Sequence, residues 1–281
     1  MTAPVDPIAF WNGEAGSRWV QHQAVLDRAL GPFGLACADA ARIAPGERVV
    51  DVGCGCGDTT LVLAERVGDA GKVLGLDVSA PMLARARERA AGRREVDFLL
   101  ADASFAPLDA GAWDLVFSRF GVMFFADRAR AFAHLGRALG AAGRLAFVCW
   151  RTAEEAEFLL VPLRAALGVV PAPEPAPAGA PGAFQLADRA VVVSLLQAAG
   201  FSRISVEPFD HDVMMGTTLE EAVEFAMQTG PVSGAIANVD ERARASVRAC
   251  VRDALAPHAR HGRVELPGGA WIVTASASRD A

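Results

Sequence analysis

A short apolar segment followed by a glycine-rich turn constrains the fold of this chain more than any other feature. Residues 48–52 (RVVDV) carry three valines, and glycine then alternates with cysteine over residues 53–57. Valines favour a strand buried on both faces, and glycine permits the left-handed backbone of a tight turn. The apolar residues 60–64 predict a helix after the turn. Because ligands of open α/β sheets bind beyond the carboxyl ends of strands, this turn is the first candidate site.

The spacing of the glycines separates the known kinds of nucleotide-binding turn. A P-loop requires Gly-Lys-Ser/Thr, but Gly57 is followed by Asp58 and Thr59. The dinucleotide motif G-x-G-x-x-G requires a glycine at position 58 or 60, and neither position has one. Asp51 and Asp58 would also place two carboxylates where a pyrophosphate binds a helix N-terminus. The turn therefore predicts a ligand that carries positive groups.

Residues 51–57 (DVGCGCG) resemble motif I of the class I S-adenosylmethionine-dependent methyltransferases. Segments 72–77, 96–103, 113–120 and 142–150 are similar to the next four strands of that family, in the same order. The resemblance is to the small-molecule, ubiquinone/menaquinone-type branch. It implies S-adenosylmethionine as cofactor and a Rossmann-like α/β sheet of seven strands with an antiparallel last strand.

The resemblance also implies roles for individual residues. Asp51 would face the amino group of the cofactor, Asp77 would accept from both ribose hydroxyls, and Asp102 would accept from the adenine amino group, while Met82 packs on the adenine. Each acid also has a structural interpretation, because aspartate often caps helices and turns. The cofactor-binding residues predicted in this way are Trp19, Asp51, Gly53, Cys54, Gly55, Asp77, Val78, Met82, Asp102, Ala103, Ser118 and Arg119.

Charge and composition limit the partners of the chain. It has 281 residues, of which 52% are hydrophobic, and a formal net charge of −6. Binding of nucleic acid usually requires a basic surface, and the densest basic run, at residues 85–94, is typical of the solvated face of a helix. No apolar run has the length of a membrane span, and residues 1–7 lack the features of a secretory leader. We expect a cytoplasmic protein with a small-molecule acceptor, no nucleic-acid partner and no membrane span; a homodimer is left open.

The cysteine and tyrosine contents exclude other kinds of chemistry. The five cysteines are odd in number and lack a disulfide framework, which fits a reducing compartment. Cys54 and Cys56 have no second pair or histidine at ligand spacing, so no metal site is predicted. Tyrosine is absent, which excludes tyrosine-dependent dehydrogenase chemistry and leaves NAD-linked oxidoreduction a distant alternative.

The order of segments predicts three parts: N-terminal cap helices at 1–45, a cofactor-binding core at 46–150, and the rest of the sheet with a helical lid at 151–281. Within the first part, Pro32 is expected to separate two helices. Residues 169–182, rich in proline and alanine, exclude a regular helix or central strand. The sixth and last strands are expected at 203–209 and 270–276. Between them, helical patterns at 218–229 and 240–256 are expected to help form the acceptor pocket.

The resemblance to the methyltransferases implies methyl transfer to a small, fairly apolar metabolite by in-line displacement. Because the cofactor is already activated, the enzyme mainly aligns the acceptor, and a base is needed only if the acceptor must lose a proton. His211 is the first candidate base, before His22, His258 and His261. Two alternatives stay open: a methyltransferase for a protein or RNA acceptor, and an S-adenosylmethionine-binding protein without turnover. One set of apolar side chains has two open interpretations: they line an acceptor pocket, or they fill the core. They are Phe120, Met123, Phe124, Phe125, Met214, Met215, Phe225 and Met227.

Overall fold

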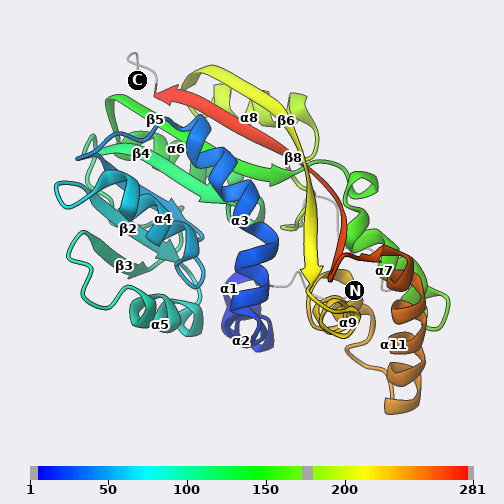
Figure 1. Cartoon of the computed structure of the whole chain (residues 1–281). Coiled ribbons are helices and arrows are strands. Elements are labelled where there is room, and N and C mark those ends of the chain that lie inside the picture. Colours follow the sequence, from blue (N-terminus) through cyan, green and yellow to red (C-terminus); the bar gives the residue numbers. More distant parts are fainter. Residues whose placement is uncertain (1–5, 173–179, 278–281) are drawn as a thin grey trace.

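One twisted sheet forms the centre of the protein (Figure 1), and the computed structural model describes residues 6–172 and 180–277. Its strands follow the order β3-β2-β1-β4-β5-β8-β6, and the short β7 pairs with β8. The strands are β1 (Arg48–Val52), β2 (Lys72–Asp77), β3 (Val96–Leu100), β4 (Trp113–Arg119), β5 (Leu139–Trp150), β6 (Phe201–Gly216), β7 (Ala259–Arg260) and β8 (Arg263–Ala277).

The first five strands are parallel, and β8 runs antiparallel between β5 and β6. The predicted fold class is thereby confirmed, including the antiparallel last strand next to the sheet edge. Val49, Val50 and Val52 of β1 are buried, as expected for a central strand with helices on both faces. Since β1 has parallel neighbours on both sides, the carboxyl ends of β1, β2 and β4 meet at one edge of the sheet.

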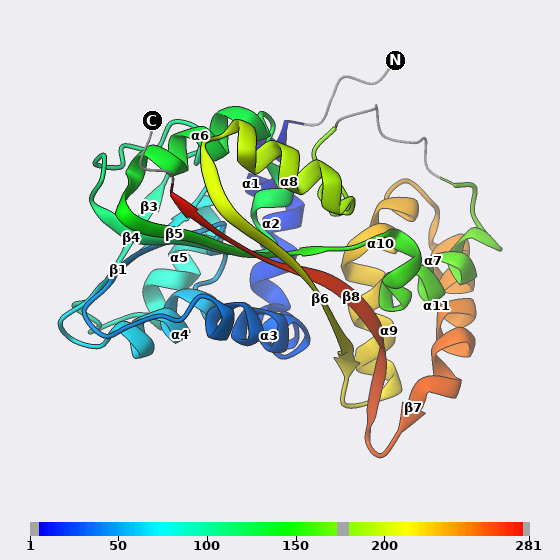
Figure 2. The same ribbon diagram turned by 90° about the horizontal axis from the view of Figure 1, so that it is seen from above.

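Helices cover both faces of this sheet, as Figure 2 shows. One face carries α3 (Gln23–Ala40), α4 (Asp58–Val67) and α5 (Ala80–Arg89), and the other carries α6 (Arg128–Ala138) and α8 (Arg189–Ala198). Two shorter helices, α1 (Pro7–Asn12) and α2 (Glu14–Gln21), precede α3, and a 3-10 turn, η1 (Val122–Phe124), follows β4. Trp11 and Asn12 bond to Val78, Ser79 and Ala80, directly after β2, so α1 lies at the carboxyl edge of the sheet, where the glycine turn also lies.

The antiparallel strands are longer than predicted, and the helices that were expected to form a lid lie around them. β6 and β8 stay paired from Phe201 and Ala277 to Gly216 and Val264, well past the end of β5. Around this extension lie α7 (Glu157–Leu167), α9 (Leu219–Gln228), α10 (Gly230–Ala235) and α11 (Glu241–Leu255) (Figure 2). Two short 3-10 turns, η2 (Ala153–Glu155) and η3 (Ala256–His258), precede α7 and β7. Helical patterns at 218–229 and 240–256 correspond to α9 and α11, whereas α10 was not predicted.

The expectation that Pro32 separates two helices is wrong. Pro32 lies inside α3, and the chain instead breaks at His22, between α2 and α3. A proline inside a helix costs about 3 kcal/mol. Leu26, Leu30 and Phe33 are buried on the face of α3 that packs on the sheet, and each such side chain contributes about 1.5–3 kcal/mol. The free energy gained by burying these three side chains therefore exceeds the cost of the proline inside the helix.

The proline-alanine stretch at 169–182 falls partly outside the described residues, because 173–179 are not described. Residues 169–172 and 180–182 form no helix or strand, as predicted. Within the described ranges, no helix combines the length and apolar composition needed to cross a bilayer.

Candidate functional site

The loop between β1 and α4 has the backbone that its glycines predict. Gly53, Gly55 and Gly57 have φ angles of 69°, 55° and 82°, which side chains other than glycine rarely adopt. The backbone N–H of Gly53 donates to the Leu76 carbonyl of β2 at 2.8 Å, and this bond fixes the start of the loop. The loop then enters α4 at Asp58.

Two of the glycines serve different purposes. A Cβ on Gly53 would lie 2.7 Å from the Cα of Gly121, so this glycine permits two backbones to cross. A Cβ on Gly55 would meet only the sulfur of Met82, at 3.9 Å. The open side of the loop is therefore at Gly55, and this is where a ligand can approach the backbone.

Because the two backbones cross so closely at Gly121, adding a single methyl group there should strongly destabilise the protein. A Cβ there would lie 2.7 Å from the Val52 carbonyl oxygen and 2.9 Å from the Cα of Gly53. Gly121→Ala should lower the free energy of unfolding by about 2–3 kcal/mol, measured by urea denaturation, because neither backbone can move aside. Gly31→Ala is the control, since nothing lies within 4 Å of its Cβ, and it should be neutral or stabilising by up to about 1 kcal/mol. Equal effects of the two substitutions would contradict the crossing.

Asp77 ends β2 and contacts the open part of the loop. Its Oδ2 accepts the backbone N–H of Gly55, and its Oδ1 accepts that of Ser79, both at 2.8 Å. The side chain is buried, and this burial raises the pKa of Asp77 despite the N–H donors. An ionised carboxylate has about four acceptor positions. Two of them remain available for the hydroxyls of a ligand at Gly55.

Asp51 lies on β1, beneath the loop, and is fully buried. Its Oδ2 accepts the hydroxyls of Thr59 and Thr60 at 2.8 and 2.7 Å. Within the described part of the chain, Oδ1 has no hydrogen-bond partner. Burial raises the pKa of Asp51 to about 6. An unpartnered buried carboxylate oxygen is costly, so the site fits a ligand that brings a cationic donor, as S-adenosylmethionine would.

The other residues predicted on β2, β3 and α5 surround the same edge. Met82 is buried at the start of α5, and the carbonyl of Val78 accepts the side-chain amide of Asn12 at 2.8 Å. Asp102 is half-buried and accepts the backbone N–H of Ser104 at 2.7 Å, while Ala103 beside it is buried. The local bond of Asp102 leaves further acceptor positions on its carboxylate.

The predicted residues from β4 have internal partners. Ser118 is buried; its hydroxyl donates to the Val52 carbonyl at 2.7 Å and accepts the Gly121 N–H at 3.2 Å. Arg119 donates to Asp58 at 2.7 Å. Cys54, which was predicted from the glycine loop itself, is buried, and burial raises the pKa of its thiol well above the usual range. The structure thus gives Ser118 and Arg119 contacts that shape the loop.

The N-terminal cap lies directly against this edge. The Trp11 carbonyl accepts the Ser79 hydroxyl at 2.7 Å, and the Asn12 side chain accepts the Ala80 N–H at 3.0 Å. Trp19 is half-buried and packs edge-to-face on Trp11, with ring centroids 5.4 Å apart. The cap is therefore bonded to the residues that follow Asp77.

His211 lies elsewhere, on the long strand β6. Its side chain is exposed, and Nδ1 lies 2.7 Å from the Asp212 carbonyl oxygen. It lines an open hollow of about 790 Å³ together with Arg151 and several carboxylates, and no residue of the glycine loop lines this hollow. The ring also packs on Phe33, with centroids 5.7 Å apart.

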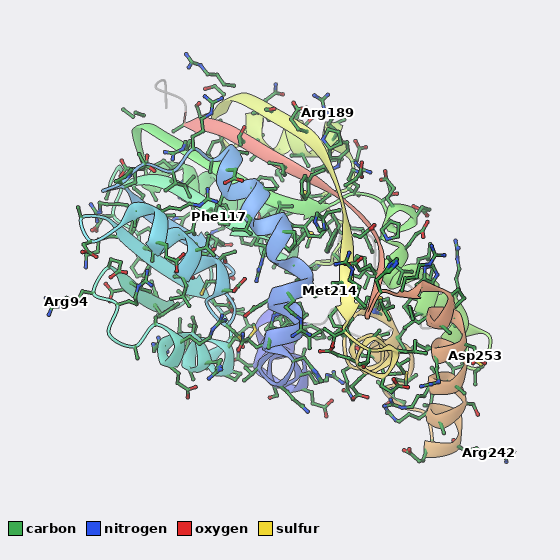
Figure 3. The ribbon with its side chains drawn as sticks, in the orientation of Figure 1. Arg94, Phe117, Arg189, Met214, Arg242 and Asp253 are labelled. Carbon is green, nitrogen blue, oxygen red and sulfur yellow. The ribbon has the colours of Figure 1, made fainter. Side chains whose placement is uncertain are left out.

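Most of the apolar side chains considered for an acceptor pocket belong to the core. Phe120, Met123, Met215, Phe225 and Met227 are buried in one hydrophobic cluster. Met214 is half-buried and lies on the part of β6 that extends toward the lid (Figure 3).

Sequence reasoning missed two threonines of the site and the contacts of one residue of the cap. Thr59 and Thr60 bond Asp51, and Asn12 bonds the residues that follow Asp77. The two threonines stand directly after the glycine turn, at the start of a helix, and this position could have revealed them. Asn12 belongs to the predicted N-terminal cap, but its hydrogen bonds could not be predicted, since its partners lie 66 and 68 residues away.

The interpretation of residues 85–94 as a solvated face is wrong for Arg89. Its side chain is only 18% exposed and makes an ion pair with Asp27 at 3.0 Å. Arg87, two residues earlier on α5, is exposed, as that interpretation requires.

Comparison with known proteins identifies the domain. A protein-family model, described as a methyltransferase domain, matches residues 49–143 of the sequence. An aklanonic acid methyltransferase from a Streptomyces species is 36% identical over 118 residues, which are 41% of this chain and 54% of the relative. A demethylmenaquinone methyltransferase from Thermus thermophilus is 45% identical over 100 residues, 35% of this chain and 45% of the relative. The chain spans about half the length of these curated relatives.

Solved structures agree on the fold. A phosphoethanolamine N-methyltransferase from Haemonchus contortus, solved with S-adenosylhomocysteine, has a TM-score of 0.62 to this chain at 18% identity. The match covers 98% of this chain and 61% of that one. At this identity the likeness concerns the fold.

The matched domain begins at Val49 of β1 and ends within β5. It therefore covers the glycine loop and the acids at the ends of the first strands, which is the segment whose motifs resemble the family. The predicted resemblance is confirmed over this segment: residues 49–143 match a methyltransferase domain.

Proposed function

We propose that this chain is an S-adenosylmethionine-dependent methyltransferase that acts on a small, fairly apolar metabolite. One observation carries the proposal: two buried carboxylates, Asp51 and Asp77, lie at the loop whose open side is Gly55, and one oxygen of Asp51 has no donor among the described residues. A cationic nucleoside supplies both the donor and the hydroxyls that these acids require. A polyphosphate would be repelled by them.

In this proposal, Asp77 holds the ribose and Asp51 faces the amino group, while Met82, Val78, Asp102 and Ala103 surround the adenine. The bound cofactor supplies an activated methyl group, which the nucleophile of the acceptor displaces in line from the sulfonium. The chain contributes alignment and exclusion of water. The cap, bonded to Ser79 and Ala80, would cover the cofactor.

The acceptor class is supported by the relatives. The similar proteins act on aklanonic acid and on demethylmenaquinone, which are small molecules. We propose an acceptor of this kind for the present chain.

The proposed location is the cytoplasm. All five cysteines are free thiols, which fits a reducing compartment.

His211 is the proposed base, if the acceptor must lose a proton. Its Nδ1 lies 2.7 Å from the Asp212 carbonyl, so a ring that donates there leaves Nε2 to accept a proton. His22 is the other candidate from the sequence; its Nε2 is buried and has no partner among the described residues.

Transfer of labelled methyl tests the proposal. The purified protein would be incubated with methyl-labelled S-adenosylmethionine and, separately, with polycyclic aromatic acids, quinone precursors, a protein lysate and transfer RNA. We expect label in a small-molecule product, and a lower kcat with an unchanged KM for the cofactor in His211→Gln. Label in the protein or RNA fraction alone would contradict the acceptor class, and binding without any product would indicate a protein without turnover. An unchanged kcat in His211→Gln would remove that residue as the base.

A further inference from the structure

A largely buried cluster of four charged side chains connects the cap to the glycine loop. Arg89 lies at the end of α5, Asp27 on α3, Asp58 at the start of α4 and Arg119 at the end of β4. Their side chains are between 11% and 23% exposed. The cluster thus joins four separate elements at a place where little water competes for the charges.

The guanidinium of Arg89 has three different partners. Nη1 donates to the Cys56 carbonyl of the glycine loop at 2.8 Å. Nη2 lies 3.0 Å from Oδ2 of Asp27 and 3.5 Å from Oδ1 of Asp58. One planar group therefore contacts the loop, the cap helix and the helix that follows the loop, a geometry to which the fork of arginine is suited.

The positive and negative groups alternate around the cluster. Arg119 lies 2.7 Å from Asp58 and 4.0 Å from Asp27, so each aspartate faces both arginines. Burial and the charge of Asp58 raise the pKa of Asp27, and both arginines oppose this rise. Removing one arginine would leave two carboxylates close together with one cation, which weakens the attachment of α3 to the loop.

The loop is held from two sides as a result. Gly55 donates its N–H to Asp77, and the next residue, Cys56, accepts from Arg89. Cys56 lies between two glycines whose φ angles are positive. Because glycine restrains the backbone so little, contacts from outside the loop must set its shape.

We propose that Arg89 is a positioning residue: through Asp27 it couples the docking of cap helix α3 to the shape of the glycine loop, and so to the affinity for the cofactor. This inference rests on the proposed function for its ligand. Arg89 itself touches the loop backbone and not the reacting atoms.

A double-mutant cycle tests the coupling. Arg89→Met, Asp27→Asn and the double variant would be titrated with S-adenosylhomocysteine by calorimetry, with urea unfolding of each variant in parallel. We expect Arg89→Met to weaken binding about tenfold or more, since it removes charge-assisted hydrogen bonds, and Asp27→Asn to weaken it about fivefold. The double variant should bind about as well as Arg89→Met alone, because both changes break one link. A merely structural role would lower the unfolding free energy and leave the affinity of the folded protein unchanged.

Arg87→Met is the matched control. Arg87 lies on the same helix and also donates to a backbone carbonyl, that of Phe98 at 3.2 Å, but it is exposed. Its removal should change the affinity by less than about twofold. Additive losses in the double variant, or equal losses in Arg87→Met and Arg89→Met, would overturn the coupling.

Hydrogen exchange separates this inference from the proposed function. Without any ligand, Arg89→Met should speed amide exchange both in the loop peptide 48–60 and in the cap peptide 14–30, and Asp27→Asn should do the same. Faster exchange in only one of the two peptides would contradict the link. If the unmodified chain does not bind S-adenosylhomocysteine, the proposed function fails, and the exchange result still decides whether Arg89 joins the two segments.

Discussion

Asp77→Asn is expected to weaken the binding of S-adenosylhomocysteine about a hundredfold or more. The carboxylate already accepts the N–H groups of Gly55 and Ser79, and its remaining acceptor positions would hold two ribose hydroxyls. Hydrogen bonds to a charged group contribute about 1.5–3 kcal/mol each. The asparagine side chain keeps one acceptor oxygen, but its NH2 group then faces a backbone N–H or a ribose hydroxyl that needs an acceptor. Calorimetric titration of the folded variant measures the loss.

The control for this substitution is Asp97→Asn on the neighbouring strand. Asp97 pairs across from Leu74 of β2 and is exposed, so its replacement should leave the affinity within about twofold. Comparable affinity in Asp77→Asn and in the unmodified protein would show that the ribose is not held at the end of β2.

Asp51→Asn is expected to stabilise the free protein near neutral pH while it weakens cofactor binding. Burial raises the pKa of Asp51 from 3.8 to about 6. Between these values the folded state binds more protons than the unfolded state, so the unfolding free energy falls as the pH rises from about 4 to about 7. A shift of this size corresponds to about 3 kcal/mol. The amide avoids this cost but leaves an NH2 group without an acceptor, so the net gain at pH 7 should be up to about 2 kcal/mol.

Urea unfolding at several pH values checks this prediction. The decrease in stability between pH 4 and pH 7 should be smaller in Asp51→Asn than in the unmodified protein, whereas Asp97→Asn should keep it. Asp77, whose pKa burial also raises, contributes in the same direction and accounts for part of the remaining slope. S-adenosylhomocysteine should bind Asp51→Asn about tenfold more weakly, since a cationic group then loses its ionised partner. A variant that is less stable at pH 7 and binds normally would contradict the role of Asp51.

The local features of the predicted cofactor-binding core, residues 46–150, could be predicted because they depend on residues that are adjacent in sequence. Valines at 49, 50 and 52 require a buried strand, and glycines at 53, 55 and 57 require a turn with positive φ angles; the structure has both. Asp77 stands at the end of a second apolar segment, so parallel pairing places it beside the loop. The strand and the turn follow from residue type and spacing and from the rule that ligands bind at the carboxyl ends of strands, whereas the role of Asp77 was predicted from the resemblance to the methyltransferase motifs.

The remaining features depend on contacts between residues distant in sequence. Pro32 breaks a helix by local rules, but the packing of Leu26, Leu30 and Phe33 on the sheet keeps α3 continuous. Arg89 lies in a run of charges that resembles a surface, and its burial follows from Asp27, 62 residues earlier. The lengths of β6 and β8 are likewise set by their mutual pairing, which no local pattern in either strand reveals.

The lid shows the same dependence on distant partners. Arg28 of α3 donates to Glu221 of α9, and Arg248 of α11 lies 2.7 Å from Glu224 of α9. The first pair joins α3 to α9 and the second joins α9 to α11, so this part of the protein is assembled from three helices that are distant in sequence. A local pattern predicts each helix, but not the surface that the helices make together.

Titration of the unmodified protein with S-adenosylhomocysteine and with NAD, side by side, shows whether the glycine loop binds a cationic nucleoside or a polyphosphate. We expect saturable binding of S-adenosylhomocysteine at a stoichiometry of about one, and far weaker binding of NAD, whose pyrophosphate would meet the carboxylates of Asp51 and Asp77. Tighter binding of NAD, or no binding of S-adenosylhomocysteine, would contradict this expectation.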